Sequence, residues 1–203
     1  MVAAAGDMFG DDRDTLDFCT GAGPGRPGQV IRLHPQTGQR HLDWLTWGLM
    51  PQAWADSVDA PRPIHARAET VIEHPMFAAA FRERRAIVPA GEYYQRRTIG
   101  EALGQHYAIS RRDGHPLALA GLWEAFRRTD GEVIRTYCIV SVAAAGEVAA
   151  IHDRMPLVLD EQDWPQWLGE TPGDPAALLR PSAAVVLVVR RVQKARPTRP
   201  SAH

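Results

Sequence analysis

HYAISRRDGHPLALAGLWEAFR (106–127) contains two apolar stretches on either side of an Asp-Gly turn, and it decides the fold class of this chain. The pattern predicts a strand, a turn and a second strand. RTYCIVSVAA (135–144) follows as a continuous apolar run, which is typical of a buried strand. Strands that follow one another this closely, with no long helix between them, favour a mostly antiparallel sheet.

Strands also dominate the sequence on both sides of this stretch. QVIRL (29–33) and RHLDWLTWGL (40–49) flank a turn and predict a hairpin, and residues 183–192 predict a last strand. The helical patterns are short and cover residues 74–85 and 160–170. The sequence has no internal repeat and no βαβα alternation. We therefore expect an α+β fold, with a curved, mostly antiparallel sheet and a few short helices.

Charge and composition exclude several classes of protein. The 203 residues carry 23 Lys and Arg against 24 Asp and Glu, for a formal net charge of -1. That balance excludes a wholly basic nucleic-acid coat but leaves room for a local basic groove. No apolar run approaches the ~20 residues that cross a bilayer, and the start of the chain lacks the basic segment of a signal peptide. Two cysteines make no disulfide framework and no zinc site, so we expect a cytoplasmic protein with no metal and no cofactor.

The segment AIHDRMPLVL (150–159) is the most informative for chemistry. It packs a histidine, an acid and an arginine into a turn before an apolar strand. Histidine titrates near neutral pH and can move protons, while arginine can hold a phosphate or a carboxylate. The alternative is a structural turn in which Asp153 caps the backbone and Arg154 pairs on the surface.

The segment VPAGEYYQRR (88–97) predicts a strand after Pro89. Strand periodicity places Tyr93 and Gln95 on one face, with Glu92 and Tyr94 on the other. Aromatic residues interleaved with arginines are suited to base stacking and phosphate contact, although ordinary aromatic packing explains the same pattern.

Three tryptophans lie within WLTWGLMPQAW (44–54), before and inside a proline-bounded loop. Indole rings in such a cluster either anchor a core or offer a face to nucleic-acid bases. We expect Trp44 to lie in the core, whereas for Trp54, in a polar loop, both readings stay open.

Six segments, in this order, make the chain resemble the SOS response-associated peptidase (SRAP) family of abasic-site processing proteins. They are WGLMPQAW (47–54), HARAET (65–70), RAIVPAGEYYQR (85–96), AGLWE (120–124), HDRMP (152–156) and WL (167–168). The resemblance covers residues 29–193 and implies one SRAP-like α+β domain around a barrel-like sheet with a positively charged groove. Residues 1–28 then form a divergent or truncated N-terminal segment, and residues 194–203 a disordered basic tail.

The resemblance also implies an activity, namely binding to single-stranded DNA and a covalent link to an abasic site. In the family, a cysteine that becomes N-terminal after removal of the initiator Met forms a thiazolidine with the ring-opened sugar. An Asn, a Glu and a His position groups and transfer protons. This chemistry is sensible because a 1,2-aminothiol captures an aldehyde as an imine before the thiol closes the ring. The family's peptidase label implies self-processing at the N-terminus.

The chain departs from the family at the positions that carry this chemistry. Of the implied catalytic positions, His152 keeps the family's residue, while Gln95 stands at the Glu position and His65 at the Asn position. Residue 2 is Val2 instead of the cysteine, and Cys19 is internal, so its amine is tied up in a peptide bond. Gln95 cannot act as an acid or base because an amide does not titrate near neutral pH. These replacements argue against thiazolidine formation.

The groove positions implied by the resemblance are better kept. They include arginines that contact phosphate or sugar in the family, together with residues that line the groove. These positions are Trp47, Trp54, Arg67, Arg85, Ser141 and Arg154. Arginines that neutralise phosphates give binding that weakens with salt.

We therefore expect an SRAP-type protein that binds single-stranded or abasic DNA, acts as a monomer without membrane partners, and is nucleoid-associated when DNA-bound. Three alternatives stay open. The chain could lack its true Met-Cys-Gly-Arg start and form crosslinks, or be a non-catalytic DNA-binding or structural remnant. It could also keep Schiff-base lyase chemistry through its α-amine, with His65 and His152 transferring protons.

Overall fold

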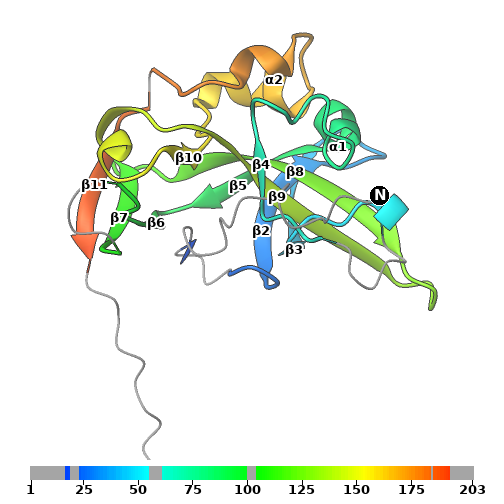
Figure 1. The fold of residues 1–203 in the computed structure, drawn as a ribbon. Helices are drawn as coiled ribbons and strands as arrows, with labels where there is room; N and C mark the ends of the chain where they lie inside the picture. The colour runs from blue at the N-terminus through cyan, green and yellow to red at the C-terminus, as the bar shows by residue number, and fades with distance from the viewer. Residues whose placement is uncertain (1–16, 19–22, 55–60, 100–103, 184, 193–203) are drawn as a thin grey trace, which may run out of the picture.

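The computed structural model describes residues 17–18, 23–54, 61–99, 104–183 and 185–192 (Figure 1). The strands are β1 (Asp17–Phe18), β2 (Pro27–Leu33), β3 (Arg40–Trp47), β4 (His65–Arg67), β5 (Arg85–Ala90), β6 (Tyr93–Arg96), β7 (His106–Arg111), β8 (Leu117–Arg127), β9 (Val133–Ala143), β10 (Arg154–Pro156) and β11 (Leu187–Val192). The helices are α1 (Ala78–Glu83), α2 (Trp164–Leu168) and the 3₁₀ turns η2 (Gln52–Trp54), η3 (Gly146–Ala150), η4 (Glu161–Asp163) and η5 (Pro175–Leu178).

Five strands close into a barrel. They pair in the order β9, β3, β2, β5 and β8, and β8 pairs with β9 to complete the ring. All these pairings are antiparallel except that of β3 with β9. Closure pairs the backbone N–H and C=O groups that would otherwise be free at the two edges of the sheet. The observed fold confirms the expected α+β class with a barrel-like sheet.

Strand β9 extends beyond the barrel and holds two short strands there. β4 pairs with it in parallel and β10 in antiparallel orientation. A second, four-stranded antiparallel sheet, in the order β1, β6, β7 and β11, stands beside the barrel (Figure 1). The second sheet meets the strands held by β9 at β10, where Gln95 of β6 donates to the Arg154 carbonyl oxygen.

The core fills the barrel and the space under the helices. Trp47, Tyr137 and Trp167 are among its largest fully buried side chains. At Gly121, on β8, a Cβ atom would lie 3.1 Å from Val88 Cγ2 and 3.3 Å from the Cys138 carbonyl oxygen. The absence of a side chain there lets β5, β8 and β9 approach closely where the ring closes.

Several sequence expectations are confirmed and others are corrected. β2 and β3 form the expected hairpin. The two strands of 106–127 form, but they join different sheets because β7 pairs with β6 and β11, whereas β8 pairs with β5 and β9. Pro89 lies inside β5, so a strand precedes the expected one. The helix expected over 74–85 is reduced to α1, and the expected basic tail (194–203) lies outside the described residues.

The expectation that Trp44 lies in the core is wrong. Its side chain is 62% exposed, whereas Trp47 is buried. The two residues are three positions apart on β3, and an odd spacing places side chains on opposite faces of a strand. The barrel interior takes Trp47, so Trp44 points outward. Within the part of the chain that the structure describes, no helix has the length and apolarity needed to span a bilayer.

Candidate functional site

Strand β9 brings two of the sequence motifs together. Arg67, at the end of β4, pairs with Ser141, and Pro156, at the end of β10, pairs with the same residue. HARAET and HDRMP therefore lie on opposite edges of one strand, although more than 80 residues separate them in the sequence. Because short strands anchored on a barrel are rigid, this arrangement fixes the side chains of both motifs relative to each other.

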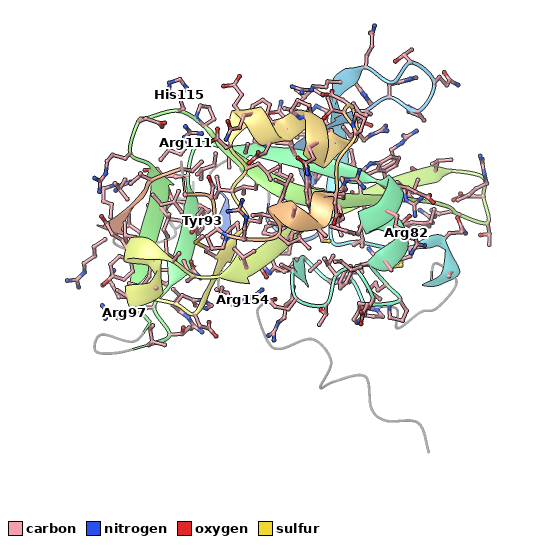
Figure 2. The ribbon with its side chains drawn as sticks, turned by 90° about the horizontal axis from the view of Figure 1, so that it is seen from above. Arg82, Tyr93, Arg97, Arg111, His115 and Arg154 are labelled. Carbon is pink, nitrogen blue, oxygen red and sulfur yellow. The ribbon has the colours of Figure 1, made fainter. Side chains whose placement is uncertain are left out.

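The side chain of Arg154, labelled in Figure 2, links these segments by hydrogen bonds. Its Nη1 and Nη2 donate to the two carboxylate oxygens of Glu69 at 2.7 and 3.0 Å. Nη2 also donates to the carbonyl oxygen and the hydroxyl of Ser141, at 2.7 and 3.1 Å. The hydrogen bond from Arg154 lowers the pKa of Glu69 below its usual value, so Glu69 is a carboxylate at neutral pH.

The backbone of Arg154 holds two further candidates. Its N–H donates to His152 Nδ1 at 2.8 Å, and its carbonyl oxygen accepts from Gln95 Nε2 at 2.9 Å. His152 Nδ1 also lies 3.1 Å from the Arg154 carbonyl oxygen, so both backbone groups of Arg154 are within hydrogen-bond distance of this ring nitrogen. The exposed Asp153 carboxylate, 3.0 Å from Nδ1, pairs with the ring only when the ring is protonated. Gln95 and His152 are both buried, and Gln95 comes from the second sheet.

His65 completes the cluster from β4. Its ring makes an edge contact with Trp47 at 5.9 Å between centroids. The ring is partly exposed, but its Nε2 is buried. Burial, helped by the positive charge of Arg154 and by His152, lowers the pKa of His65 to about 3. His65 is therefore neutral at physiological pH.

Five of the expected residues, together with Glu69, thus form one cluster, which we call the Arg154 cluster. Its members are His65, Glu69, Gln95, Ser141, His152 and Arg154. The sequence analysis gave no role to Glu69. A signal for it was present, because it is the single acidic residue of HARAET and lies beside the expected phosphate-binding arginines.

Glu92 does not replace the missing acid of Gln95. As strand periodicity predicts, Tyr93 and Gln95 are buried on one face of β6. The Glu92 carboxylate instead accepts from the Tyr94 hydroxyl at 2.8 Å and from Arg190 Nη2 at 3.1 Å. The Glu92 carboxylate therefore pairs with residues of the second sheet and not with Gln95 or Arg154.

The remaining expected DNA contacts differ in their surroundings. Arg67 is exposed and its guanidinium forms no hydrogen bond or ion pair among the described residues, but its positive charge helps to lower the pKa of Glu69. The indole of Trp47 is fully buried, donates to the Ile64 carbonyl oxygen at 2.9 Å and stacks on Tyr137, so it belongs to the core. The side chain of Trp54 lies outside the described part of the chain.

Arg85 lies in a different environment, at the ends of the two α-helices. Its Nε donates to the Trp167 carbonyl oxygen, and its Nη1 donates to the carbonyl oxygens of Phe81 and Arg82, at 2.6 Å each. Burial lowers the pKa of Arg85 from its usual value. Because these bonds satisfy carbonyl groups at helix ends, the structure favours a helix-capping role for Arg85.

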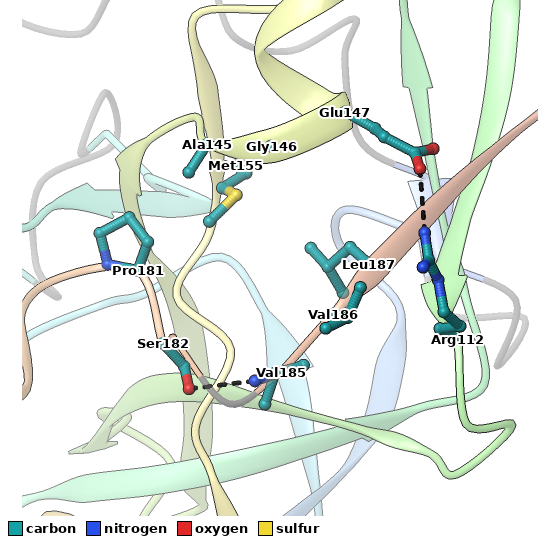
Figure 3. A pocket seen from close by; sticks show the side chains of 10 residues that line it. All are labelled: Arg112, Ala145, Gly146, Glu147, Met155, Pro181, Ser182, Val185, Val186 and Leu187. Carbon is teal, nitrogen blue, oxygen red and sulfur yellow. Dashed lines mark hydrogen bonds and ion pairs between the residues drawn. The ribbon is translucent and has the colours of Figure 1, made fainter.

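A separate cavity of about 340 Å³ lies between β11 and η3 (Figure 3). Its lining is mainly apolar, with the Arg112–Glu147 ion pair at 3.3 Å among its polar groups. Met155 lines it, and because Met155 follows Arg154 on β10, its side chain points away from the Arg154 cluster. No group of three His, Cys, Asp or Glu side chains able to hold a metal ion occurs in the described ranges.

Comparison with known proteins finds relatives of similar sequence. The chain is 30% identical over 146 residues to the abasic site processing protein YobE of Bacillus subtilis, covering 72% of this chain and 67% of that one. It is 31% identical over 155 residues to YoqW of the same organism, also named an abasic site processing protein, covering 75% and 69%. For the Escherichia coli protein YedK, of the same name, identity is 33% over 141 residues, covering 69% and 60%.

Solved structures share the fold. A protein from Bordetella bronchiseptica has a TM-score of 0.71 and 26% identity, covering 84% of this chain and 86% of that one. A protein from Bacteroides thetaiotaomicron has a TM-score of 0.72 and 23% identity, covering 83% and 75%. The model of the SOS response associated peptidase (SRAP) family matches residues 11–196, which include every strand of the barrel and every member of the Arg154 cluster. The chain therefore belongs to the SOS response associated peptidase family.

Proposed function

We propose that this protein binds single-stranded DNA at abasic sites through the Arg154 cluster, and that it does so without forming a covalent bond. The observation that carries the proposal is the pairing of Arg154 with Glu69, close to the exposed guanidinium of Arg67. A carboxylate held by two guanidinium nitrogens has the geometry with which arginine also holds a phosphate. The relatives are named abasic site processing proteins, which is why we choose an abasic site as the DNA lesion.

Charge at the cluster supports a phosphate contact that exchanges with Glu69. The Glu69 side chain is 52% exposed, so its carboxylate can turn into water and leave Arg154 to a DNA phosphate. Arg67 offers a second guanidinium at the other edge of β9. Each neutralised phosphate releases counterions, so affinity would fall as salt rises.

The chemistry of Gln95 supports binding without covalent chemistry. Its amide is buried and bonded to the backbone of Arg154, at the position where the family has a glutamate. An amide neither gives nor takes a proton near neutral pH. Glu92 is bonded to Tyr94 and Arg190 and cannot take over this role. His65, neutral and with a pKa near 3, is a weak base.

We extend the proposal to the setting of the protein. It acts as a monomer in the cytoplasm, is nucleoid-associated when bound to DNA, and works through one domain over residues 29–193. The conserved fold, with its β9-centred site, supports a single binding surface.

The test uses the full chain with single-stranded DNA that carries one abasic site, run on native and denaturing gels in parallel. We expect a native shift that weakens with salt and no band that survives denaturation. Arg67→Ala should weaken the shift several-fold, whereas Arg82→Ala should not. Arg82 is a matched control because it is an exposed arginine on α1, away from Arg154 (Figure 2).

A band that survives denaturation would refute the non-covalent part of the proposal and support a crosslinking protein. Equal binding by the Arg67→Ala and Arg82→Ala variants would move the DNA contact away from the Arg154 cluster. Absence of any shift at moderate salt would refute DNA binding and favour a structural remnant.

A further inference from the structure

The cavity between β11 and η3 is separate from the Arg154 cluster, and the proposed function does not use it (Figure 3). Its volume of about 340 Å³ lies at the lower end of the range, roughly 300–1,000 Å³, in which proteins hold small molecules. Apolar residues make up most of its described lining, namely Ala145, Met155, Pro181, Val185, Val186 and Leu187. An apolar group is favoured over water in such a space, because water finds few hydrogen-bond partners there.

Two opposite charges stand at the rim of this cavity. Arg112 Nη2 lies 3.3 Å from Glu147 Oε1, and the two side chains are 63% and 51% exposed. An exposed ion pair of this kind contributes little stability, so a ligand can replace it at little cost. Glu147 keeps a partner without Arg112, because its Oε2 accepts the Val189 N–H at 3.2 Å. The Arg112 N–H donates to the Val186 carbonyl oxygen at 2.9 Å, which fixes the Arg112 backbone beside β11.

This rim favours a ligand that carries both charges. Because the charges of Arg112 and Glu147 sum to zero, a simple anion gains beside Arg112 what it loses beside Glu147, and a simple cation does the reverse. A zwitterion avoids this conflict, since its carboxylate can pair with Arg112 while its ammonium group pairs with Glu147 Oε1. An α-amino acid joins these two groups through one carbon atom, and its side chain can then extend into the apolar cavity.

We propose that this cavity binds a free α-amino acid with an apolar side chain, such as leucine. Burial of the side chain supplies most of the affinity, and the two exposed ion pairs at the rim set the orientation. The expected affinity is in the millimolar range, because the ligand buries few atoms. The site is independent of DNA binding, since Met155 lines the cavity and points away from the Arg154 cluster.

The methyl group of Met155 gives a direct readout, because Met155 lines the cavity. The full chain, labelled with carbon-13 at its methionine methyl groups, is titrated with L-leucine and followed by NMR, and Met155→Leu assigns the signal. We expect a saturable shift of the Met155 signal. Isocaproate lacks the ammonium group and isoamylamine lacks the carboxylate, so each should bind roughly three- to fivefold more weakly than leucine. Glycine lacks the apolar side chain and should give no saturable shift.

Variants at the rim assign the two ion pairs. Arg112→Gln should bind leucine and isoamylamine equally, because the carboxylate has lost its partner. Glu147→Gln should bind leucine and isocaproate equally, because the ammonium group has lost its partner. Arg128→Gln is the matched control, since Arg128 forms another exposed ion pair, 3.4 Å from Glu132 on the turn between β8 and β9. It should keep both preferences.

A variant in the lining assigns the apolar part of the site. Ala145→Phe adds a ring at the cavity wall without removing a charged group, and it should abolish leucine binding. Ala149→Phe adds the same ring at an exposed position of η3 outside the described lining, and it should leave binding unchanged. Circular dichroism checks that both variants are folded. Arg112→Gln and Glu147→Gln change exposed side chains, so they test the proposal even where Ala145→Phe fails to fold.

Three results would overturn the proposal. Absence of a saturable Met155 shift at millimolar leucine would show that the cavity takes no amino acid. Equal binding of leucine, isocaproate and isoamylamine by the unmodified chain would show that the rim does not recognise a zwitterion. Unchanged leucine binding by a folded Ala145→Phe variant would place the ligand outside the cavity.

Discussion

Arg85 and Arg154 are both partly buried arginines in family motifs, but they differ in what they hold. Arg85 donates only to backbone carbonyl oxygens, at the ends of α1 and α2. Arg154 donates to the exposed carboxylate of Glu69 as well as to Ser141. A carbonyl group in a folded backbone cannot leave, whereas an exposed side chain can rotate into water at little cost. Under the proposed function, a motif arginine is available to DNA when an exchangeable partner holds it.

The largest effect on stability is expected for Arg85. Its absence would contradict the structural role that sets Arg85 apart from Arg154. Arg85→Ala should lower the free energy of unfolding by roughly 2–4 kcal/mol, because it leaves partly buried carbonyl groups without donors. Urea unfolding measures the change, and DNA affinity at a temperature where the variant is folded should stay within twofold of the unmodified chain. A stable variant with tenfold weaker DNA binding would place Arg85 in the DNA interface.

The opposite result is expected for Arg154. Arg154→Ala should weaken binding to abasic single-stranded DNA by roughly 10- to 30-fold, because it removes a bidentate phosphate contact. Arg154→Lys keeps the charge and loses the planar pair, so it should restore only part of the affinity. Titrations at several salt concentrations supply the check. An unchanged salt slope in Arg154→Ala would show that Arg154 contacts no phosphate.

The burial of His65, helped by the charge of Arg154, also predicts how stability depends on pH. Because the folded pKa of His65 is about 3, the unfolded chain binds a proton below about pH 6.5 that the folded chain does not. Stability therefore falls as pH drops, by about 2 kcal/mol from this group between pH 7 and pH 5. His65→Asn should remove this part of the dependence in urea unfolding at the two pH values. An identical pH dependence in the variant would contradict a neutral His65.

The smallest effect is expected for Glu69. Glu69→Gln removes the carboxylate that competes with DNA for Arg154, so affinity should rise by roughly two- to fivefold. Glu73→Gln is a suitable control, because Glu73 is an exposed acid on the same loop that forms no ion pair among the described residues. Weaker DNA binding by Glu69→Gln would mean that Glu69 positions Arg154 and does not compete with phosphate.

The sequence predicted those features that depend on neighbouring residues. The hairpin of β2 and β3 and the buried strand β9 follow from local turn and apolar patterns, and the face shared by Tyr93 and Gln95 follows from strand periodicity. Family motifs located Arg154 and His152. Periodicity also places Trp44 and Trp47 on opposite faces, but it cannot say which face meets the core, and the choice of Trp44 was wrong.

The features that the sequence could not predict depend on contacts between distant segments. Nothing local to residues 106–127 shows that β7 and β8 join different sheets, because strand pairing is decided by the whole barrel. The bond between Glu69 and Arg154 joins residues from opposite edges of β9 and has no signature in either motif. The orientation of the Gln95 amide depends on the backbone of β10 and is equally invisible in the sequence.

The position of β9 also bears on how the protein folds. Trp47 must meet Tyr137, and His65 must meet Ile139, before the ring can close, so the chain has to search over long sequence separations. Such non-local pairing makes folding slow, because loop entropy is lost before contacts compensate for it. The Arg154 cluster cannot exist in a partly folded chain, since its motifs meet only on a docked β9. Formation of the Arg154 cluster is thereby coupled to completion of the barrel, and a ribosome must have released residue 156 before the cluster can form.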